Sequence, residues 1–164
     1  MSVKYGKMQT EIFGTIYILV NEKELFDISL SEEDWEKTNE TYSPEYDQKD
    51  SLVVEIIEQL TEYFEGNRKT FTVPIKLTGT AFQQQVWQEL CKIPYGETRC
   101  YADIATAIDN PKAVRAVGQA NRKNPIPIVV PCHRVIGKDK SLTGYTGTRT
   151  DLKEKLLQLE GITV

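Results

Sequence analysis

The stretch "NPIPIVVPCHRVIG", residues 124–137, sets three prolines around a short apolar run that ends in Cys132 and His133. His133 is the only histidine in the chain. The run "IPIVVP" is too short and too closely bounded by proline for a helix, so we predict a buried strand that presents Cys132 at a fixed position. A cysteine next to a histidine is in most proteins structural, because free cysteine is usually a small buried hydrophobe. The surrounding sequence has to show whether this pair is catalytic or structural.

The composition is that of a globular protein. Of 164 residues, 40% are hydrophobic and 27% are charged, which fits one ordinary domain or two small ones. The first ten residues hold no apolar core of signal-peptide length, and no run approaches a membrane span. The three cysteines, Cys91, Cys100 and Cys132, form no CxxC pair. This argues against a disulfide framework or a zinc cluster, and we expect a cytoplasmic protein with no membrane partner.

The net charge of −4 hides an asymmetry between the two halves of the chain. Residues 1–75 carry 7 basic and 16 acidic side chains, a net charge of −9. Residues 76–164 carry 13 basic and 8 acidic side chains, a net charge of +5. A basic half permits a nucleic-acid partner, but two ordinary solvated surfaces would explain the charges equally well.

Residues 1–75 predict a small α+β domain. Two β-rich runs around a turn, 11–20 and 24–30, indicate a hairpin. The acidic segment 31–50, which Pro44 interrupts, is expected to be an irregular connection.

The end of this half predicts one helix and an extended segment. The helix runs from Ser51 as N-cap to Gly66 as the stop. Its apolar stripe consists of Val53, Ile56, Ile57, Leu60 and Phe64. Residues 71–77 read as a strand or as an extended link to the next domain. We find no chemical constellation before residue 76.

From residue 76 the pattern is mainly helical. A Thr80–Gln83 capping box opens a helix with Phe82, Val86 and Leu90 on one buried stripe. The composition of "IPYGET" (93–98) is typical of a turn, and "YADIATAI" (101–108) predicts a short helix.

A second short helix is predicted over "KAVRAVGQAN" (112–121). Asn110 would cap it, Pro111 would take the first helical position, and Val114 and Val117 would be buried. Two short helices joined by a tight turn form a helix-turn-helix pattern. Small helical hairpins are nevertheless common, and an alanine- and glycine-rich helix is more often close-packed than DNA-reading.

His133 is the one imidazole that could assist a thiolate at Cys132. Consecutive side chains point apart in extended backbone, so the pair needs a bend or a bridging water. A third group normally orients such an imidazole. Glu160 is the candidate, at the end of a helical run with a stripe of leucines at 152, 156 and 159. Spacing alone equally allows a solvated glutamate.

These motifs resemble those of the O6-alkylguanine-DNA alkyltransferases, also called methylated-DNA–protein-cysteine methyltransferases. The similarity runs from about Phe82 to Gly161. Its segments are "FQQQVWQEL", "IPYGET", "YADIA", "NPKAVRAVGQANRKNPIPIVVPCHRVIG", "GYTG" and "LLQLEG". The "PCHRV" core, preceded by "RAVG" at this distance, is highly specific, whereas residues 1–75 match loosely.

The resemblance implies an α+β fold. Residues 1–75 would form a small ribonuclease H-like α/β domain, followed by a helical C-terminal domain, residues 76–164, with a winged-helix or helix-turn-helix motif. Some relatives hold zinc in the first domain. No cysteine or histidine precedes Cys91 here, so no metal is expected, and the family's reaction needs no cofactor.

The implied activity is DNA repair by irreversible, single-turnover transfer of an alkyl group to the protein itself. The substrate would be O6-alkylguanine in double-stranded DNA, with O4-alkylthymine as a second candidate, and the protein would act as a monomer. Cys132 matches the acceptor, His133 the base acting through a water, Glu160 the orienting carboxylate and Tyr101 the residue placed at guanine N3. A relay of this kind would lower the effective pKa of the thiol.

The same resemblance assigns residues to DNA and to the alkyl pocket. The target base must leave the duplex, and the family docks its helix-turn-helix in the minor groove. The DNA-binding set is Ala113, Arg115, Ala116, Gly118, Gln119, Arg122 and Asn124, with Arg115 filling the vacated stack and Asn124 as a hinge. The pocket set is Val135, Tyr145, Thr146 and Lys153. We also expect Arg122, Lys123 and Arg134 to contact phosphates.

Two alternatives and one departure from the family stay open. A lesion-binding module without transfer would lack the cysteine, and a Cys-His hydrolase would turn over, so the stoichiometry of alkylation distinguishes all three. After "GYTG" the chain reads "TRTDLKEK", where relatives often carry a second glycine and a Gly-Leu pair. We therefore expect the pocket rim, and with it the range of alkyl groups and the alignment of Lys153, to differ from those of relatives.

Overall fold

The structure is a computed structural model that describes residues 2–137 and 150–163. The chain divides into two compact units, Met1–Leu77 and Thr78–Val164, and together they make an α+β protein. The boundary expected after residue 75 lies two residues before this division. Tyr145 and Thr146, two of the expected pocket residues, lie outside the described residues.

The first unit is built on a four-stranded sheet in the order β3-β2-β1-β4. The central pairs are antiparallel, and β4 runs parallel to β1. The strands are β1 (Lys4–Thr10), β2 (Gly14–Val20), β3 (Leu25–Ser29) and β4 (Glu45–Tyr46). The predicted hairpin is confirmed as β2 and β3. The first strand escaped prediction because "KYGKMQT" mixes polar side chains with a glycine and alternates only weakly.

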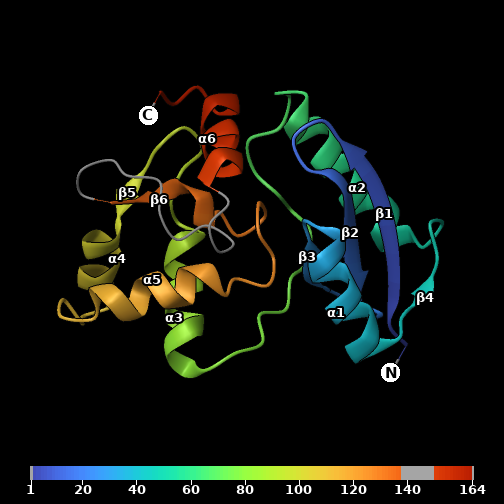
Figure 1. The fold of residues 1–164 in the computed structure, drawn as a ribbon, viewed down its shortest axis with the longest axis horizontal. Coiled ribbons are helices and arrows are strands. Elements are labelled where there is room, and N and C mark those ends of the chain that lie inside the picture. Colours follow the sequence, from blue (N-terminus) through green and yellow to red (C-terminus); the bar gives the residue numbers. More distant parts are fainter. Residues whose placement is uncertain (1, 138–149, 164) are drawn as a thin grey trace. The chain divides into compact units, whose positions relative to one another are not determined.

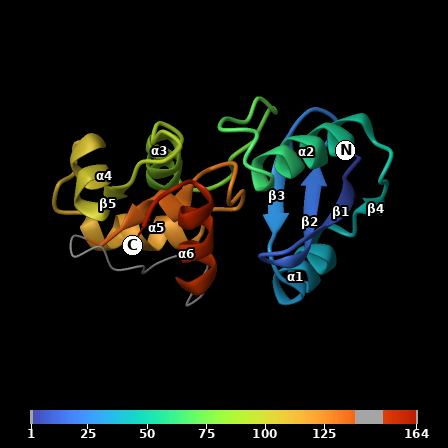
Figure 2. The same ribbon diagram turned by 90° about the horizontal axis from the view of Figure 1, so that it is seen from above.

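Two helices, α1 (Glu32–Tyr42) and α2 (Ser51–Phe64), cover opposite faces of this sheet (Figure 2). On one face the Trp35 ring of α1 stacks on Tyr17 of β2, with ring centroids 4.5 Å apart and planes 3° from parallel. On the other face Gly6 of β1 leaves room for Val53 of α2, since a Cβ at Gly6 would lie 2.3 Å from the valine side chain. Adjacent strand residues alternate between the faces, so β2 is buried on both sides.

The irregular connection expected over residues 31–50 is wrong, because most of it is α1. Ser31 caps the helix by accepting a hydrogen bond from the Asp34 amide at 3.1 Å, and three acidic side chains lie in the first turn, where the helix dipole favours them. Trp35 is its single buried residue. One large aromatic side chain anchors a helix that is otherwise polar, and such a helix leaves a weak periodic signal.

The second helix is confirmed, with a shift at its N-terminal end. Asp50, not Ser51, is the N-cap, because its carboxylate accepts from the amides of Leu52 and Val53. Gly66 follows the last turn with a φ of +80°, as the stop signal predicted. The buried stripe contains Gln59 and Tyr63, while Ile57 and Phe64 are half-buried.

In the second unit, α3, α4 and α5 pack against one another, and Figure 1 shows α5 crossing α3. The two-stranded sheet β5-β6 is parallel, and α6 packs on a short 3-10 turn, η1. The elements are α3 (Ala81–Leu90), β5 (Arg99–Cys100), α4 (Tyr101–Ala107), α5 (Val114–Arg122), η1 (Cys132–Arg134), β6 (Val135–Ile136) and α6 (Thr150–Leu159). The capping box of Thr80 and Gln83 is confirmed.

The buried Trp87 ring joins α3 to α5. Its indole nitrogen donates to the Ala120 carbonyl at 2.8 Å. Val86 and Leu90 are buried as predicted, whereas Phe82 is half-buried.

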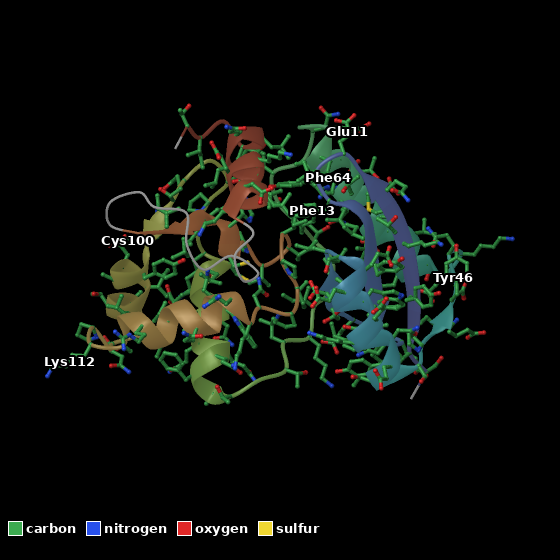
Figure 3. The ribbon with its side chains drawn as sticks, in the orientation of Figure 1. Glu11, Phe13, Tyr46, Phe64, Cys100 and Lys112 are labelled. Carbon is green, nitrogen blue, oxygen red and sulfur yellow. The ribbon has the colours of Figure 1, made fainter. Side chains whose placement is uncertain are left out.

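The start predicted for α5 is wrong. The helix begins at Val114 with Ala113 as N-cap and no side-chain cap, while Asn110 accepts from the Ala113 amide within the preceding turn. Figure 3 shows Lys112 in this turn, pointing away from the helices. Val117 is buried as predicted, but Val114, the first residue of the helix, is 38% exposed.

The buried strand predicted before Cys132 is also wrong. Residues 126–130 form a closed turn in which the Val130 amide donates to the Ile126 carbonyl at 2.9 Å. Ile128 has a φ of +76° and is 1% exposed. A left-handed backbone at a β-branched residue costs about 1–3 kcal/mol, so the surrounding packing must hold it.

Candidate active site

Cys132 begins η1 and is buried, with 1% of its surface exposed. Burial raises the pKa of its thiol to about 11, against a hydrogen bond from Asn124 and the charge of Lys153, which both lower it. The resting side chain at neutral pH is therefore a thiol. The expected low thiol pKa is not a property of this resting state, and a nucleophile at Cys132 has to lose its proton as part of the reaction.

His133 and Glu160 meet directly, as the sequence predicted. Nε2 of the imidazole lies 2.6 Å from Oε2 of the carboxylate, and both side chains are fully buried. Burial lowers the pKa of His133, although Glu160 opposes this shift. The tight turn of η1 and the end of α6 bring the two residues together. The straight strand predicted here would lack the bend that η1 provides.

Arg134 completes this buried cluster and is not exposed for contact with DNA phosphates. It is 6% exposed, and its Nε and Nη2 atoms donate to the two oxygens of Glu160 at 2.8 and 3.1 Å. Nη1 donates to the Ile93 carbonyl at 2.8 Å. The expectation that Arg134 binds DNA backbone is wrong, because its guanidinium is committed to a buried carboxylate.

Two asparagines connect the end of α5 to the nucleophile. Asn124 donates to the Val130 carbonyl at 2.8 Å and accepts from the Ile126 amide at 3.0 Å, which closes the strained turn. Asn121 donates to the Cys132 carbonyl at 3.3 Å and is completely buried. Asn121 was missed. The signal was a polar residue four positions after Val117, on the buried side of a helix whose other inward residues are apolar.

Tyr101, Lys153 and Val135 lie together, and the charge of Lys153 acts on the Cys132 thiol. The Lys153 ammonium donates to the Val135 carbonyl and lies 5.8 Å from the centre of the Tyr101 ring. Burial lowers the pKa of Lys153 to about 8, and the charge of Cys132 raises it. A buried cation therefore stands beside the nucleophile, where it favours the thiolate.

The outer face of α5 carries exposed positive charge. Arg115, Ala116, Gln119, Arg122 and Lys123 are all exposed and follow one side of the helix at spacings of three and four. Within the described ranges, no ion pair is formed by Arg115, Arg122 or Lys123. Ala113 and Gly118 are half-buried. Gly118 faces the Tyr101 ring, 4.0 Å from where a Cβ would stand, so this glycine gives the tyrosine room inside the unit.

The remaining candidates concern metals and membranes. Over residues 2–137 and 150–163, no group of three or more His, Cys, Asp or Glu side chains could hold a metal ion. Within the same ranges, no helix combines the length and the hydropathy needed to cross a membrane.

Fold and site together define a two-unit protein. Its second unit holds a buried cysteine, followed by a histidine in contact with a glutamate, and the basic helix α5. The ribonuclease-like domain model of 6-O-methylguanine DNA methyltransferase matches residues 3–77, and the DNA-binding domain model matches residues 81–162. The chain belongs to the 6-O-methylguanine DNA methyltransferase family.

Similar proteins agree with this membership. A constitutive methylated-DNA–protein-cysteine methyltransferase of Bacillus subtilis is 52% identical over 149 residues, which cover 91% of this chain and 90% of the relative. The Haemophilus influenzae relative of the same name is 45% identical over 137 residues, covering 82% and 76%. The crystal structure of Mycobacterium tuberculosis O6-methylguanine methyltransferase has a TM-score of 0.86 at 41% identity, covering 96% of this chain and 92% of that one. A further structure from that organism, with the same values, is of OGT in complex with DNA.

Proposed function

We propose that the protein repairs DNA by transferring an alkyl group from O6 of guanine to Sγ of Cys132, once per chain and without a cofactor. The observation that carries this proposal is the 2.6 Å contact between His133 and Glu160. His133 is the residue that directly follows the buried Cys132. A member of this family with an intact cysteine, base and carboxylate has what the reaction requires. O4-alkylthymine is a second candidate substrate.

The chemistry balances within the site. The thiol proton passes through a water to His133, whose other ring nitrogen is held by Glu160. The sulfur lone pair forms the S–C bond as the C–O6 bond breaks. The leaving guanine takes up one proton, for which Tyr101 at N3 is the donor, and the proton that His133 received returns through water to Tyr101. The products are an S-alkylcysteine and an unmodified guanine.

The pocket would hold the flipped base by backbone and side-chain groups. Val135 and Thr146 would contact the base, and Tyr145 would line the pocket. Lys153 would border it, and its charge near Cys132 supports the thiolate.

DNA binding would use α4 and α5 as a helix-turn-helix docked in the minor groove. The exposed charges along α5 support this assignment, because phosphate neutralisation supplies most of the affinity of such surfaces. Arg115 would fill the stack that the flipped base leaves. The face also includes Ala113, Ala116, Gly118, Gln119 and Arg122, while Asn124 acts as the hinge to the cysteine segment. We place the protein in the cytoplasm, acting as a monomer.

Intact-mass measurement tests this function. After incubation with duplex DNA containing O6-methylguanine, the protein should gain one methyl group, with peptide mapping assigning it to Cys132 and not to Cys91 or Cys100. The reason is that the His133 relay serves one cysteine. A chain that binds the lesion and gains no mass would be a lesion-binding module, and release of product beyond one equivalent per chain would identify a hydrolase.

A further inference from the structure

Glu160 accepts hydrogen bonds at both of its carboxylate oxygens. Oε2 accepts from His133 at 2.6 Å and from Nη2 of Arg134 at 3.1 Å. Oε1 accepts from Nε of Arg134 at 2.8 Å and from the Gly96 amide at 3.3 Å. Arg134 therefore donates to both oxygens, in the planar, two-point geometry that arginine offers and lysine does not.

We propose that Arg134 is a positioning residue for the deprotonation of Cys132, acting through Glu160. It holds the carboxylate ionised and in the plane that keeps His133 neutral and ready to accept the thiol proton. This inference rests on the proposed function for its biological meaning, but it concerns a proton transfer that can be measured without any DNA.

The electrostatic reason is the cost of an isolated buried charge. A carboxylate out of water without a counter-ion either takes up a proton or holds a neighbouring imidazole as imidazolium. Either outcome blocks the relay, because a protonated Glu160 no longer orients the imidazole and a protonated His133 accepts no proton. The guanidinium of Arg134 balances the carboxylate and lowers the pKa of His133, so the imidazole stays a base.

Arg134 is itself held by groups outside the catalytic set. Its Nη1 donates to the Ile93 carbonyl at 2.8 Å, and its guanidinium carbon lies 5.7 Å from the centre of the Tyr95 ring. The turn after α3 thus fixes the arginine, which fixes the carboxylate.

The other titratable groups around this cluster come from three elements. They are Cys91 and Tyr95 of the turn after α3, Cys132 of η1 and Lys153 of α6. Lys153 is the second cation that lowers the pKa of His133. Arg134 combines a positive charge with direct two-point contact to the carboxylate.

The test compares pH profiles of Cys132 alkylation in wild type, Arg134→Gln and Arg134→Lys. Free O6-benzylguanine is the substrate, iodoacetamide a parallel probe, and intact mass the readout between pH 5 and pH 9. In Arg134→Gln the imidazole becomes easier to protonate, so the midpoint of the acid limb should rise by about one pH unit. Arg134→Lys keeps the positive charge and loses the planar, two-point contact with Glu160. The midpoint of its acid limb should therefore stay at the wild-type value, while the plateau rate of alkylation falls.

A matched control is Arg68→Gln in the first unit. Arg68 also donates to one carboxylate, of Glu62 at 2.7 Å, and to one carbonyl, of Thr70 at 2.9 Å. It belongs to the first unit and not to the Cys132–His133–Glu160 cluster, so its substitution should leave the profile unchanged.

A double-mutant comparison covers the case in which Arg134→Gln does not fold. If Arg134 acts through Glu160, adding Arg134→Gln to Glu160→Gln should not slow alkylation further. A further loss in this background, or an unshifted profile in a folded Arg134→Gln protein, overturns the inference. Failure of wild type to gain a methyl group from duplex DNA containing O6-methylguanine would contradict the proposed function instead, and the iodoacetamide profiles, with the adduct mapped to Cys132, would still decide the role of Arg134.

Discussion

Cys132 is deeply buried although it is the proposed nucleophile, and the groups around it explain how a buried thiol can react. Burial raises the pKa of the thiol to about 11, which keeps it protonated and shielded while it waits. Reactivity then depends on a partner that removes the proton at the moment of attack, because a buried thiolate without compensation would be costly. Under the proposed relay, selectivity for Cys132 over the exposed Cys91 would follow from access to His133 and not from resting acidity.

Asp27 of β3, in the first unit, is a half-buried carboxyl whose titration is displaced. Burial raises the pKa of this carboxyl to about 7, and Asp34 of α1 adds to the shift while Ser29 opposes it. The folded form therefore holds a proton that the unfolded form releases near pH 4. The free energy of unfolding therefore falls as the pH rises from about 4 to about 7.

We predict that Asp27→Asn stabilises the protein at pH 8 and leaves its stability unchanged at pH 4. The amide removes the cost of a buried charge and still accepts a hydrogen bond from Ser29, so the gain at pH 8 should be on the order of 2 kcal/mol. Urea unfolding followed by circular dichroism at both pH values measures it. A gain of equal size at pH 4 would contradict the titration argument.

Asp47→Asn is the control of opposite sign. Lys4 holds the pKa of this exposed carboxyl below its usual range, mainly through a hydrogen bond. Its contribution is present above the unfolded pKa and is lost as the pH falls. The amide variant should therefore be less stable than wild type at pH 8, with the difference vanishing at low pH.

At the residue scale, short motifs and the family resemblance predicted Cys132, His133 and Glu160 but missed the residues that support them. Cys132 and His133 are adjacent, and the resemblance identified Glu160, which lies 27 positions after His133. Arg134 was misassigned, because a basic residue in a basic half of the chain suggests a phosphate contact until the buried carboxylate beside it is known. Asn121 was overlooked because its partner is a backbone carbonyl, which leaves no trace in side-chain patterns.

At the scale of elements, α5 has two faces with separate tasks. The outer face carries Arg115 with other exposed cations, and the inner face ends in Asn121, which donates to the Cys132 carbonyl at 3.3 Å. A single helix of nine residues thus combines the proposed contact with DNA and a direct hydrogen bond to the nucleophile's backbone.

Substitutions on the two faces of α5 should therefore differ by substrate. Arg115→Ala should slow transfer from duplex DNA and leave the reaction with free O6-benzylguanine unchanged, because it acts on the vacated base stack. Asn121→Ala should slow both reactions by a similar factor, about fivefold for one lost hydrogen bond. Single-turnover rates with both substrates measure this, and a free-base reaction that depends strongly on Arg115 would refute the division of tasks.

The elements that were predicted correctly carry strong local signals, and those that failed depend on tertiary contacts. The capping box of α3 and the glycine stop of α2 are local chemistry and appeared as expected. Helix α1 depends on one tryptophan that stacks on another element. The turn before Cys132 depends on Asn124 and on the packing around Ile128, whose left-handed backbone no β-branched residue favours by itself.

At the scale of the whole molecule, charge is divided between the halves of the chain. The net charge of −9 on residues 1–75 repels DNA, so attraction has to come from residues 76–164 with their net charge of +5. With Arg134 committed to Glu160, the exposed groups left for phosphates include Arg122 and Lys123.

We predict that Cys132→Ser abolishes transfer and keeps wild-type affinity for duplex DNA. The affinity should fall as salt rises, with a log–log slope of roughly −0.9 per neutralised phosphate. In that background, Arg122→Gln and Lys123→Gln should each flatten the slope by about one, whereas Lys23→Gln in the acidic half should not. Titration of labelled duplex at several salt concentrations measures these slopes, and binding that is indifferent to salt would remove DNA as the partner.

The position of Trp87 has a spectroscopic consequence. The chain has two tryptophans, and one lies in each unit: Trp35 stacks on Tyr17 in the first, and Trp87 donates to the Ala120 carbonyl of α5 in the second. Replacing either by phenylalanine leaves a single indole fluorophore that reports on one unit alone. The variant that retains Trp87 then carries a built-in optical sensor for α5, because loss of the bond to Ala120 exposes the indole to water and shifts its emission to the red.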